Sequence, residues 1–310
     1  MATSGSTDFT VNRTELVESS LRLAGLLDPG ISASAKQNTQ AVQTLQIYLK
    51  HLISRGPNLW RQEEGVVFLN EDDQSYDLGP SGDEATKLSD LVATTVDGDH
   101  LATDSTILVA SITGMASGDR IGIELADGTR QWTTINGAPA SLTVTLTTAL
   151  TGDVSDGATV YTYTGKIERP VRITSVRRLH GDIEVPIALV SREEYFQLPN
   201  KDSAGKVVQA YYHPVLTNGK LYVWPTADDV ADQIRFSYER SFEDMDGVSN
   251  NLDLPVEWIE TVKYGLAYRL AQEMSGSYQR ISMLKAEAES REAQLLAFDQ
   301  EYASVYLAPG

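Results

Sequence analysis

The sequence predicts an α+β protein in which N- and C-terminal helices form a helical bundle beside an antiparallel β region that carries an inserted all-β module. Three observations support this fold class. Apolar residues recur at three- and four-residue steps near both ends of the chain, they alternate with period two in the middle, and a Thr-, Ser-, Gly- and Asp-rich stretch interrupts the middle. With 310 residues, 41% of them hydrophobic, the chain is long enough for one large domain or two ordinary ones.

Two helices forming a hairpin are expected at the N-terminal end. Capping boxes at Asn12 to Glu15 and Ser34 to Gln37 open them, and Gly56 with Pro57 ends the second helix. Trp60, just past that end, is expected to fold back onto the pair. The apolar stripes of the two helices consist of Leu16, Val17, Leu21, Leu23, Ala24, Leu27, Val42, Leu45, Leu49, Leu52 and Ile53.

Two further helices are expected near the C-terminal end. The first starts with Asp253 as its cap and Pro255 in its first turn, and it breaks at Gly276. The second runs from about Tyr278 to about Tyr302 and is thinly apolar, which is typical of a projecting arm or of a helix that docks on another subunit; a solvated surface helix is the alternative. Its apolar positions are Ile281, Leu284, Ala288, Leu295 and Phe298.

Short strands are expected between these helical regions. Residues 85–165 set strand-like runs between turn signals, with a hairpin turn at Asp127-Gly128, and are predicted to form the inserted β module. Residues 1–84 and 166–310 then form a discontinuous core. Strands are expected within 167–179, 183–190, 206–214, 220–227 and 233–242 as an antiparallel set, with a short helix opened by Ser191 and Glu194.

The charge distribution argues against a protein that wraps nucleic acid. The net charge is −18, and between Glu63 and Asp127 fifteen acidic residues face only Lys87 and Arg120, a net of −13. A basic stretch follows from Lys166 to Arg192; it is either an exposed strand face or a contact for a negatively charged partner. No apolar run approaches the roughly 20 residues of a membrane span, and the first ten residues do not resemble a secretory signal.

No catalytic, cofactor or metal site is predicted. The chain has no cysteine, and its four histidines are scattered without metal-ligand spacing. The acidic loops 97–104 and 243–253 lack the pattern of a calcium-binding loop, and no phosphate-binding loop or nucleophile elbow is present. The tyrosines concentrated on strands are explained by cross-strand packing or by a stacking platform for sugars or bases.

The order of these segments resembles the head-to-tail adaptor, or tail accessory factor, proteins of tailed bacteriophages. The resemblance covers Phe9 to Asp77 and Lys166 to Ser277, and is clearest in GKLYVWP, in SYERSFEDMD and in the helix that opens at LPVEW. The resemblance rests on the order and the general character of the segments, because no piece is a short diagnostic motif. The inserted module departs from the smaller members of the family.

The resemblance implies a structural, non-enzymatic virion protein at the head-tail junction, made in the host bacterial cytoplasm, that forms a ring, usually dodecameric. Its implied partners are the portal protein, tail nozzle or tail spike or fibre proteins, other copies of itself, and packaged DNA through weak channel contact, with no membrane and no cofactor. The implied contacts to the portal or a neighbouring subunit are Leu295, Phe298, Tyr302, Tyr306 and Leu307. The implied DNA-channel contacts are Arg169, Arg172, Arg177 and Arg178.

Two other functions remain open from the sequence. One is a receptor- or glycan-binding tail component that uses the inserted β module. The other is a tail enzyme that degrades envelope polymers, since dispersed active sites leave no local trace.

Overall fold

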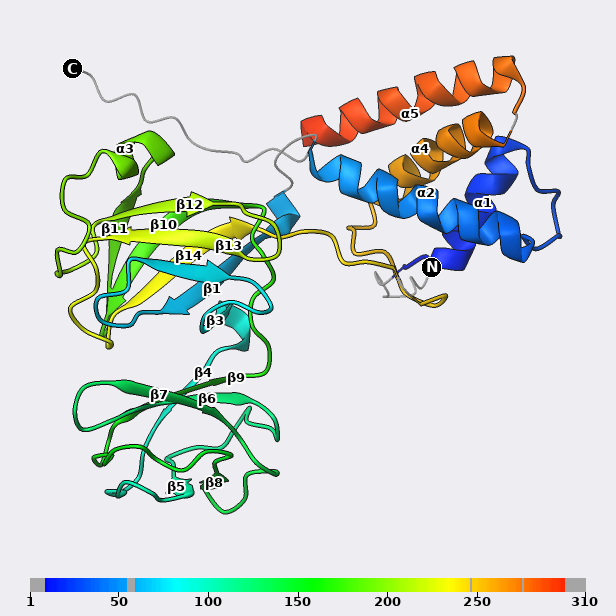
Figure 1. Cartoon of the computed structure of the whole chain (residues 1–310). Coiled ribbons are helices and arrows are strands. Elements are labelled where there is room, and N and C mark those ends of the chain that lie inside the picture. Colours follow the sequence, from blue (N-terminus) through cyan, green and yellow to red (C-terminus); the bar gives the residue numbers. More distant parts are fainter. Residues whose placement is uncertain (1–8, 55–58, 246, 275, 299–310) are drawn as a thin grey trace, which may run out of the picture. The chain divides into compact units, whose positions relative to one another are not determined.

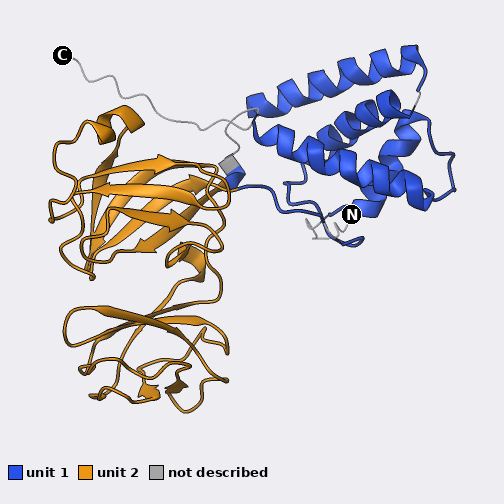
Figure 2. Ribbon diagram, in the orientation of Figure 1, with its two compact units in different colours: residues 1–61, 241–310 blue, residues 62–240 orange. Residues whose placement is uncertain are grey.

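The structure is a computed structural model that describes residues 9–54, 59–245, 247–274 and 276–298 (Figure 1). The chain divides into two compact units, residues 1–61 with 241–310 and residues 62–240 (Figure 2). The first unit is helical and the second is mainly β, so the predicted mixed α+β class is confirmed. The predicted module boundaries at residues 85 and 165 fall inside the second unit and stay a prediction.

The helices of the first unit pack around one hydrophobic cluster, which is the partner of the apolar faces seen in the sequence. Leu45 from the second helix, Leu16 from the first and Leu266 from the fourth are all fully buried in it. Trp60 packs against this cluster, but its ring lies on Phe242 and Trp258 and not, as expected, on the two N-terminal helices alone. The α-helices that the structure describes in this unit are α1 (Arg13–Ala24), α2 (Ala35–Ile53), α4 (Trp258–Glu273) and α5 (Tyr278–Phe298).

The predicted capping boxes at the starts of α1 and α2 are confirmed. The Asn12 side chain accepts a hydrogen bond from the amide of Glu15, and the Glu15 carboxylate accepts one from the amide of Asn12. Ser34 and Gln37 make the same reciprocal pair before α2. Both motifs satisfy amide groups that the first helical turn leaves without partners.

Helix α4 begins later than predicted. Its first residue is Trp258, whose amide donates to the carbonyl of Pro255 at 3.0 Å, so Pro255 belongs to a turn that precedes the helix. The prediction that Asp253 caps α4 is wrong. Its Oδ2 instead accepts a hydrogen bond from the amide of Glu243 at 3.0 Å and closes the loop before the helix.

Helix α5 lies along α4 and is not a projecting arm over the residues described. Leu284 is buried against Ala24, Ala267 and Ala271, and Leu295 is buried in the main cluster of the unit. The guanidinium of Arg291 lies 4.1 Å from the centre of the Tyr264 ring. A sparse apolar stripe is thus enough to cover one side of α4. No described helix has the length and apolar composition needed to cross a bilayer.

The second unit contains an eight-stranded sheet in the order β2-β13-β12-β11-β10-β14-β1-β3. Every one of these strands contributes a side chain to a single hydrophobic cluster, so the sheet curls around its own core (Figure 1). The strands are β1 (Gln62–Phe68), β2 (Ser75–Leu78), β3 (Ala85–Lys87), β10 (Arg172–His180), β11 (Ile183–Leu189), β12 (Gln209–His213), β13 (Gly219–Trp224) and β14 (Gln233–Glu239).

The predicted antiparallel set has one exception. Strands β11 and β12 pair in parallel over Ala188 with Gln209 and Leu189 with Ala210. A parallel pair needs a crossover, and helix α3 (Arg192–Phe196) lies in the connection. The capping box of Ser191 and Glu194 opens this helix as predicted.

The inserted segment has a hydrophobic cluster of its own. The turn at Asp127-Gly128 joins two antiparallel strands as predicted, and Gly128 supplies the positive φ of 84° that the turn needs. The strands of this segment form a four-stranded sheet in the order β4-β9-β6-β7 and a separate pair. They are β4 (Val92–Thr95), β5 (Thr106–Leu108), β6 (Arg120–Glu124), β7 (Arg130–Thr134), β8 (Thr143–Thr145) and β9 (Thr159–Tyr163).

Strand β1 is buried on both faces because the inserted segment packs on it. Val67 faces the core of the curled sheet, whereas Val66 and Phe68 face the insert. The Phe68 ring packs against Trp132 and Tyr161, with ring centres 4.9 Å and 5.0 Å away. The insert is therefore held by aromatic packing as well as by its two covalent connections.

A polar cluster centred on Glu84 lies beside this aromatic contact. Glu84 accepts hydrogen bonds from Arg120 and from the hydroxyl of Tyr163, both in the insert, and its carboxylate lies 3.3 Å from Lys166. Burial and this carboxylate raise the pKa of Tyr163, so the phenol stays protonated and can donate. Glu84 thus joins both covalent connections of the insert.

Candidate functional site

The predicted DNA-channel arginines do not form one basic patch. Arg177 and Arg178 are neighbours on β10, so their side chains leave opposite faces of the sheet. Ile234, which lies opposite Arg178, is buried in the core, whereas Arg177 lies opposite Arg235 on the other face. A run of arginines in sequence is divided between two environments here.

Arg177 belongs to a neutral network of two arginines and two glutamates. Its guanidinium lies 2.6 Å from Glu64 and 3.5 Å from Glu184, and Arg235 lies 2.6 Å from the same Glu184. The hydrogen bond to Glu64 raises the pKa of Arg177. This part of the face is a set of ion pairs between strands. That arrangement favours the first interpretation of the basic stretch, an exposed strand face.

Arg172 and Arg169 lie outside the ion-pair network of Arg177. The Arg172 side chain is 62% exposed, and its Nε is 3.8 Å from the buried Glu239. Arg169 is half-buried beside Tyr212, whose hydroxyl donates to the carbonyl of Pro170 at 2.6 Å. Burial raises the pKa of Tyr212 to about 12, although Arg169 opposes the shift. Arg172 is the predicted arginine with the most accessible charge.

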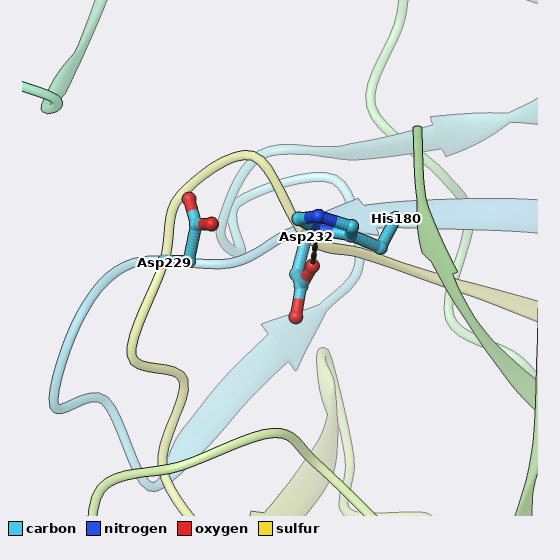
Figure 3. Close-up of side chains that lie close together, drawn as sticks. All are labelled: His180, Asp229 and Asp232. Carbon is cyan, nitrogen blue, oxygen red and sulfur yellow. Dashed lines mark hydrogen bonds and ion pairs between the residues drawn. The ribbon is translucent and has the colours of Figure 1, made fainter. Parts of the chain in front are cut away.

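Arg178 belongs to a second charged cluster, built around the fully buried Asp232. Figure 3 shows Asp232 with His180 and Asp229. His180 Nδ1 lies 2.6 Å from Asp232 Oδ1. Lys206 Nζ and Arg178 Nε lie 3.4 Å and 3.8 Å from Asp232 Oδ2. A buried carboxylate is tolerated when cations surround it in this way.

The same lysine links two more carboxylates. Lys206 Nζ lies 3.1 Å from Asp228 and 3.5 Å from Asp229. Burial would lower the pKa of Lys206, but the hydrogen bond to Asp228 and the nearby carboxylates raise it overall. Burial would raise the pKa of Asp229, but the amide of Ala231 and Lys206 lower it overall. Both groups are therefore held in their charged forms.

His180, Asp229 and Asp232 also present ligand atoms within 4.8 Å of one another, a spacing that suits a metal ion. The ammonium of Lys206, however, already contacts both carboxylates. The cluster is best explained as an ion-pair network that ties the end of β10 to the loop before β14. Sequence reasoning missed it because about fifty residues separate His180 from its carboxylates.

The clustered tyrosines pack against one another. Tyr211 and Tyr222 stack on adjacent strands with ring centres 5.7 Å apart, and Tyr195 from α3 covers them. Tyr195 and Tyr211 are buried, and Phe196 is the ring of this group that is half exposed. Cross-strand packing therefore accounts for these aromatic residues, and α3 covers the face that a stacking platform would need.

The acidic loop 97–104 uses two of its carboxylates to bind backbone, whereas Asp244 of the loop 243–253 pairs with Lys50 at 2.8 Å. Asp99 accepts a hydrogen bond from the amide of Asp156 at 2.8 Å, and Asp104 accepts one from the amide of Leu101 at 3.0 Å. These bonds account for the closely spaced aspartates as loop-closing groups.

The predicted contacts at the end of the chain separate into three groups. Leu295 is buried against its own chain, and Phe298 is 73% exposed. Tyr302, Tyr306 and Leu307 lie outside the described residues. Phe298 is thus the described member of the set with an accessible apolar side chain.

Comparison with known proteins places the chain in a family. No curated protein matches it. VP17, a capsid protein of bacteriophage P23-77, aligns at 13% identity over 57% of this chain and 79% of that one, with a TM-score of 0.12 that carries no structural argument. The family model described as SU10 adaptor protein matches residues 119–306, which include part of the insert and none of α1 or α2. Since that is more than half of the chain, the protein belongs to the SU10 adaptor protein family, a family of phage structural proteins.

Proposed function

We propose that this protein forms the ring that joins the portal to the tail in a tailed bacteriophage, extends the DNA channel and helps to retain packaged DNA. The observation that carries the proposal is the adaptor-family match over residues 119–306, which spans most of the curled sheet together with α4 and α5. The protein acts as a virion component at the head-tail junction. Its partners are the portal, a tail nozzle, spike or fibre protein, and further copies of itself.

The charge of the second unit supports a channel role. Residues 63–84, which precede the insert, carry eight acidic side chains and no basic one. The acidic insert itself we place on the outside, because a bulky domain in the lumen would obstruct DNA. Negatively charged side chains repel the phosphates of DNA. An acidic channel wall therefore lets a duplex slide without binding it tightly. The mechanism is electrostatic and mechanical, and it requires no bond to be made or broken.

Retention of DNA then rests on few cations. Arg177 and Arg178 already pair with carboxylates, so we assign the main phosphate contact to Arg172, with Arg169 as a weaker second contact. An exposed guanidinium can approach a phosphate at little desolvation cost.

The Arg172→Gln variant tests this assignment. We expect particles carrying it to lose packaged DNA more readily than wild-type particles, with a difference that shrinks as salt rises. DNA release from purified particles on mild heating is the measurement. Arg177→Gln is the matched control, and equal release from the two variants would contradict the assignment.

Portal binding is tested by mixing the purified chain with portal rings from the same virus and sedimenting the mixture. We expect the chain to travel with the ring. Sedimentation of the full chain apart from the ring would contradict the proposed function.

A further inference from the structure

An open apolar groove runs between α1 and α4 in the helical unit. Its volume is about 710 Å³, within the range of ~300–1,000 Å³ in which ligand pockets fall. Phe9 and Val256, both in its lining, are 67% and 46% exposed. The apolar side chains that line it are Phe9, Val11, Leu16, Val256 and Ile259. Surface of this kind gains free energy when an apolar partner covers it.

Some charged side chains at the groove have an ion-pair partner, and one cation does not among the described residues. Arg22 pairs with Glu18 at 2.7 Å, and Glu260 pairs with Arg291 of α5 at 3.3 Å. Lys263 also lines the groove, and among the described residues its ammonium has no ion pair. Glu15 lines the groove as well, so its charged side chains are three carboxylates and two cations. An occupant must therefore bring mainly apolar side chains, with a carboxylate placed to meet Lys263.

We infer that the groove binds the segment of the same chain that follows α5, with Tyr302, Val305, Tyr306 and Leu307 as the apolar anchors. The segment 299–310 also carries Asp299 and Glu301, which can pair with Lys263. Residues 1–8 also adjoin the groove in sequence, but Met1 is their one large apolar side chain.

The reach of the segment agrees with this assignment. Arg291 contacts the groove residue Glu260, and Phe298 lies seven residues further, roughly 10 Å along a helix. Residues 302–307 lie four to nine positions beyond Phe298, a reach of roughly 13 to 30 Å for extended chain. The anchors can therefore enter the groove of their own molecule.

Binding of a fluorescent peptide with the sequence of residues 299–310 tests the inference by anisotropy. A chain ending at Phe298 should bind the peptide, and the full chain should bind it at least tenfold more weakly because its own segment occupies the groove at high effective concentration. This protection should not change with protein concentration. Equal binding to both chains, or no binding to the shorter one, would overturn the inference.

Variants of the shorter chain locate the site. Ile259→Glu should abolish peptide binding and Lys263→Gln should weaken it, whereas Ile47→Glu, at a residue of α2 that is 63% exposed, should leave it unchanged. Circular dichroism checks that the variants remain folded. Binding that survives Ile259→Glu in a folded variant would overturn the assignment to this groove, and protection that disappears on dilution would show that a second copy supplies the segment. None of these outcomes depends on the portal, so the inference and the proposed function can fail separately.

Discussion

At the residue scale, the fold places its buried charges where opposite charges meet them. Asp232 has no exposed surface, yet His180, Lys206 and Arg178 surround its two oxygens. Removing one member of such a set leaves the others without compensation. Asp232 lies between β13 and β14, so these pairs connect that loop to β10. The residues come from distant parts of the sequence, so their proximity could not be predicted from spacing.

The Lys206→Met variant tests this network through pH. The pKa of Lys206 is raised in the folded chain, so its stabilising contribution is complete below its ordinary value of 10.5 and is lost as pH rises through the higher folded value. Because the side chain is 39% exposed, we expect a loss of about 1 kcal/mol or less at pH 7.

The measurement is the free energy of unfolding of wild type and variant across this range. The difference between them should shrink toward zero above pH 10.5. The Lys285→Met variant, in an exposed pair, is the control. A difference that grows with alkaline pH would contradict a raised pKa for Lys206 in the folded chain.

At the element scale, helix ends and strand pairs are set by different kinds of information. The capping boxes before α1, α2 and α3 were predicted correctly because each depends on residues three positions apart. The start of α4 was not, since a loop contact of Asp253 competes with the cap. The parallel pairing of β11 and β12 depends on contacts across a connection and leaves no local signal.

Helix α4 provides a prediction at this scale. A methyl group at Gly265 would lie 2.1 Å from the hydroxyl of Tyr48, which is buried and stacked with Arg269 at 3.9 Å. Alanine favours helix over glycine by about 1 kcal/mol, but overpacking costs about 1–3 kcal/mol.

We therefore expect Gly265→Ala to lower the unfolding temperature of the chain. Gly265→Ala combined with Tyr48→Phe should recover little of the loss, because the ring carbons Cζ and Cε1 would still lie 2.3 Å and 2.5 Å from the new methyl group. A higher unfolding temperature for the single variant would contradict the close packing of α2 on α4.

The contact between the insert and β1 provides a second prediction. Phe68 is 2% exposed and touches Trp132, Tyr161 and Tyr163, so Phe68→Ala should cost about 3–5 kcal/mol in the second unit. Hydrogen exchange should rise in β1 and across residues 120–134. Leu108→Ala, at a residue 42% exposed, is the control, and unchanged exchange in Phe68→Ala would contradict aromatic docking of the insert.

At the scale of the whole molecule, the net charge of −18 and the adaptor-family match are the two observations on which the proposed channel role rests. The sequence predicts the mixed α+β class and the adaptor resemblance, and the family match supports membership over residues 119–306. What it could not predict is which arginines stay accessible, because Arg177 and Arg178 look alike in sequence and lie on opposite faces of one strand. The groove between α1 and α4 likewise depends on helices more than two hundred residues apart.

The measurement that tests the central claim most directly is the mass, by native mass spectrometry, of portal rings from the same virus before and after addition of this chain. The account predicts a gain of a fixed number of copies that matches the symmetry of the portal. Portal rings whose mass is unchanged by an excess of the folded chain would contradict the proposed adaptor role.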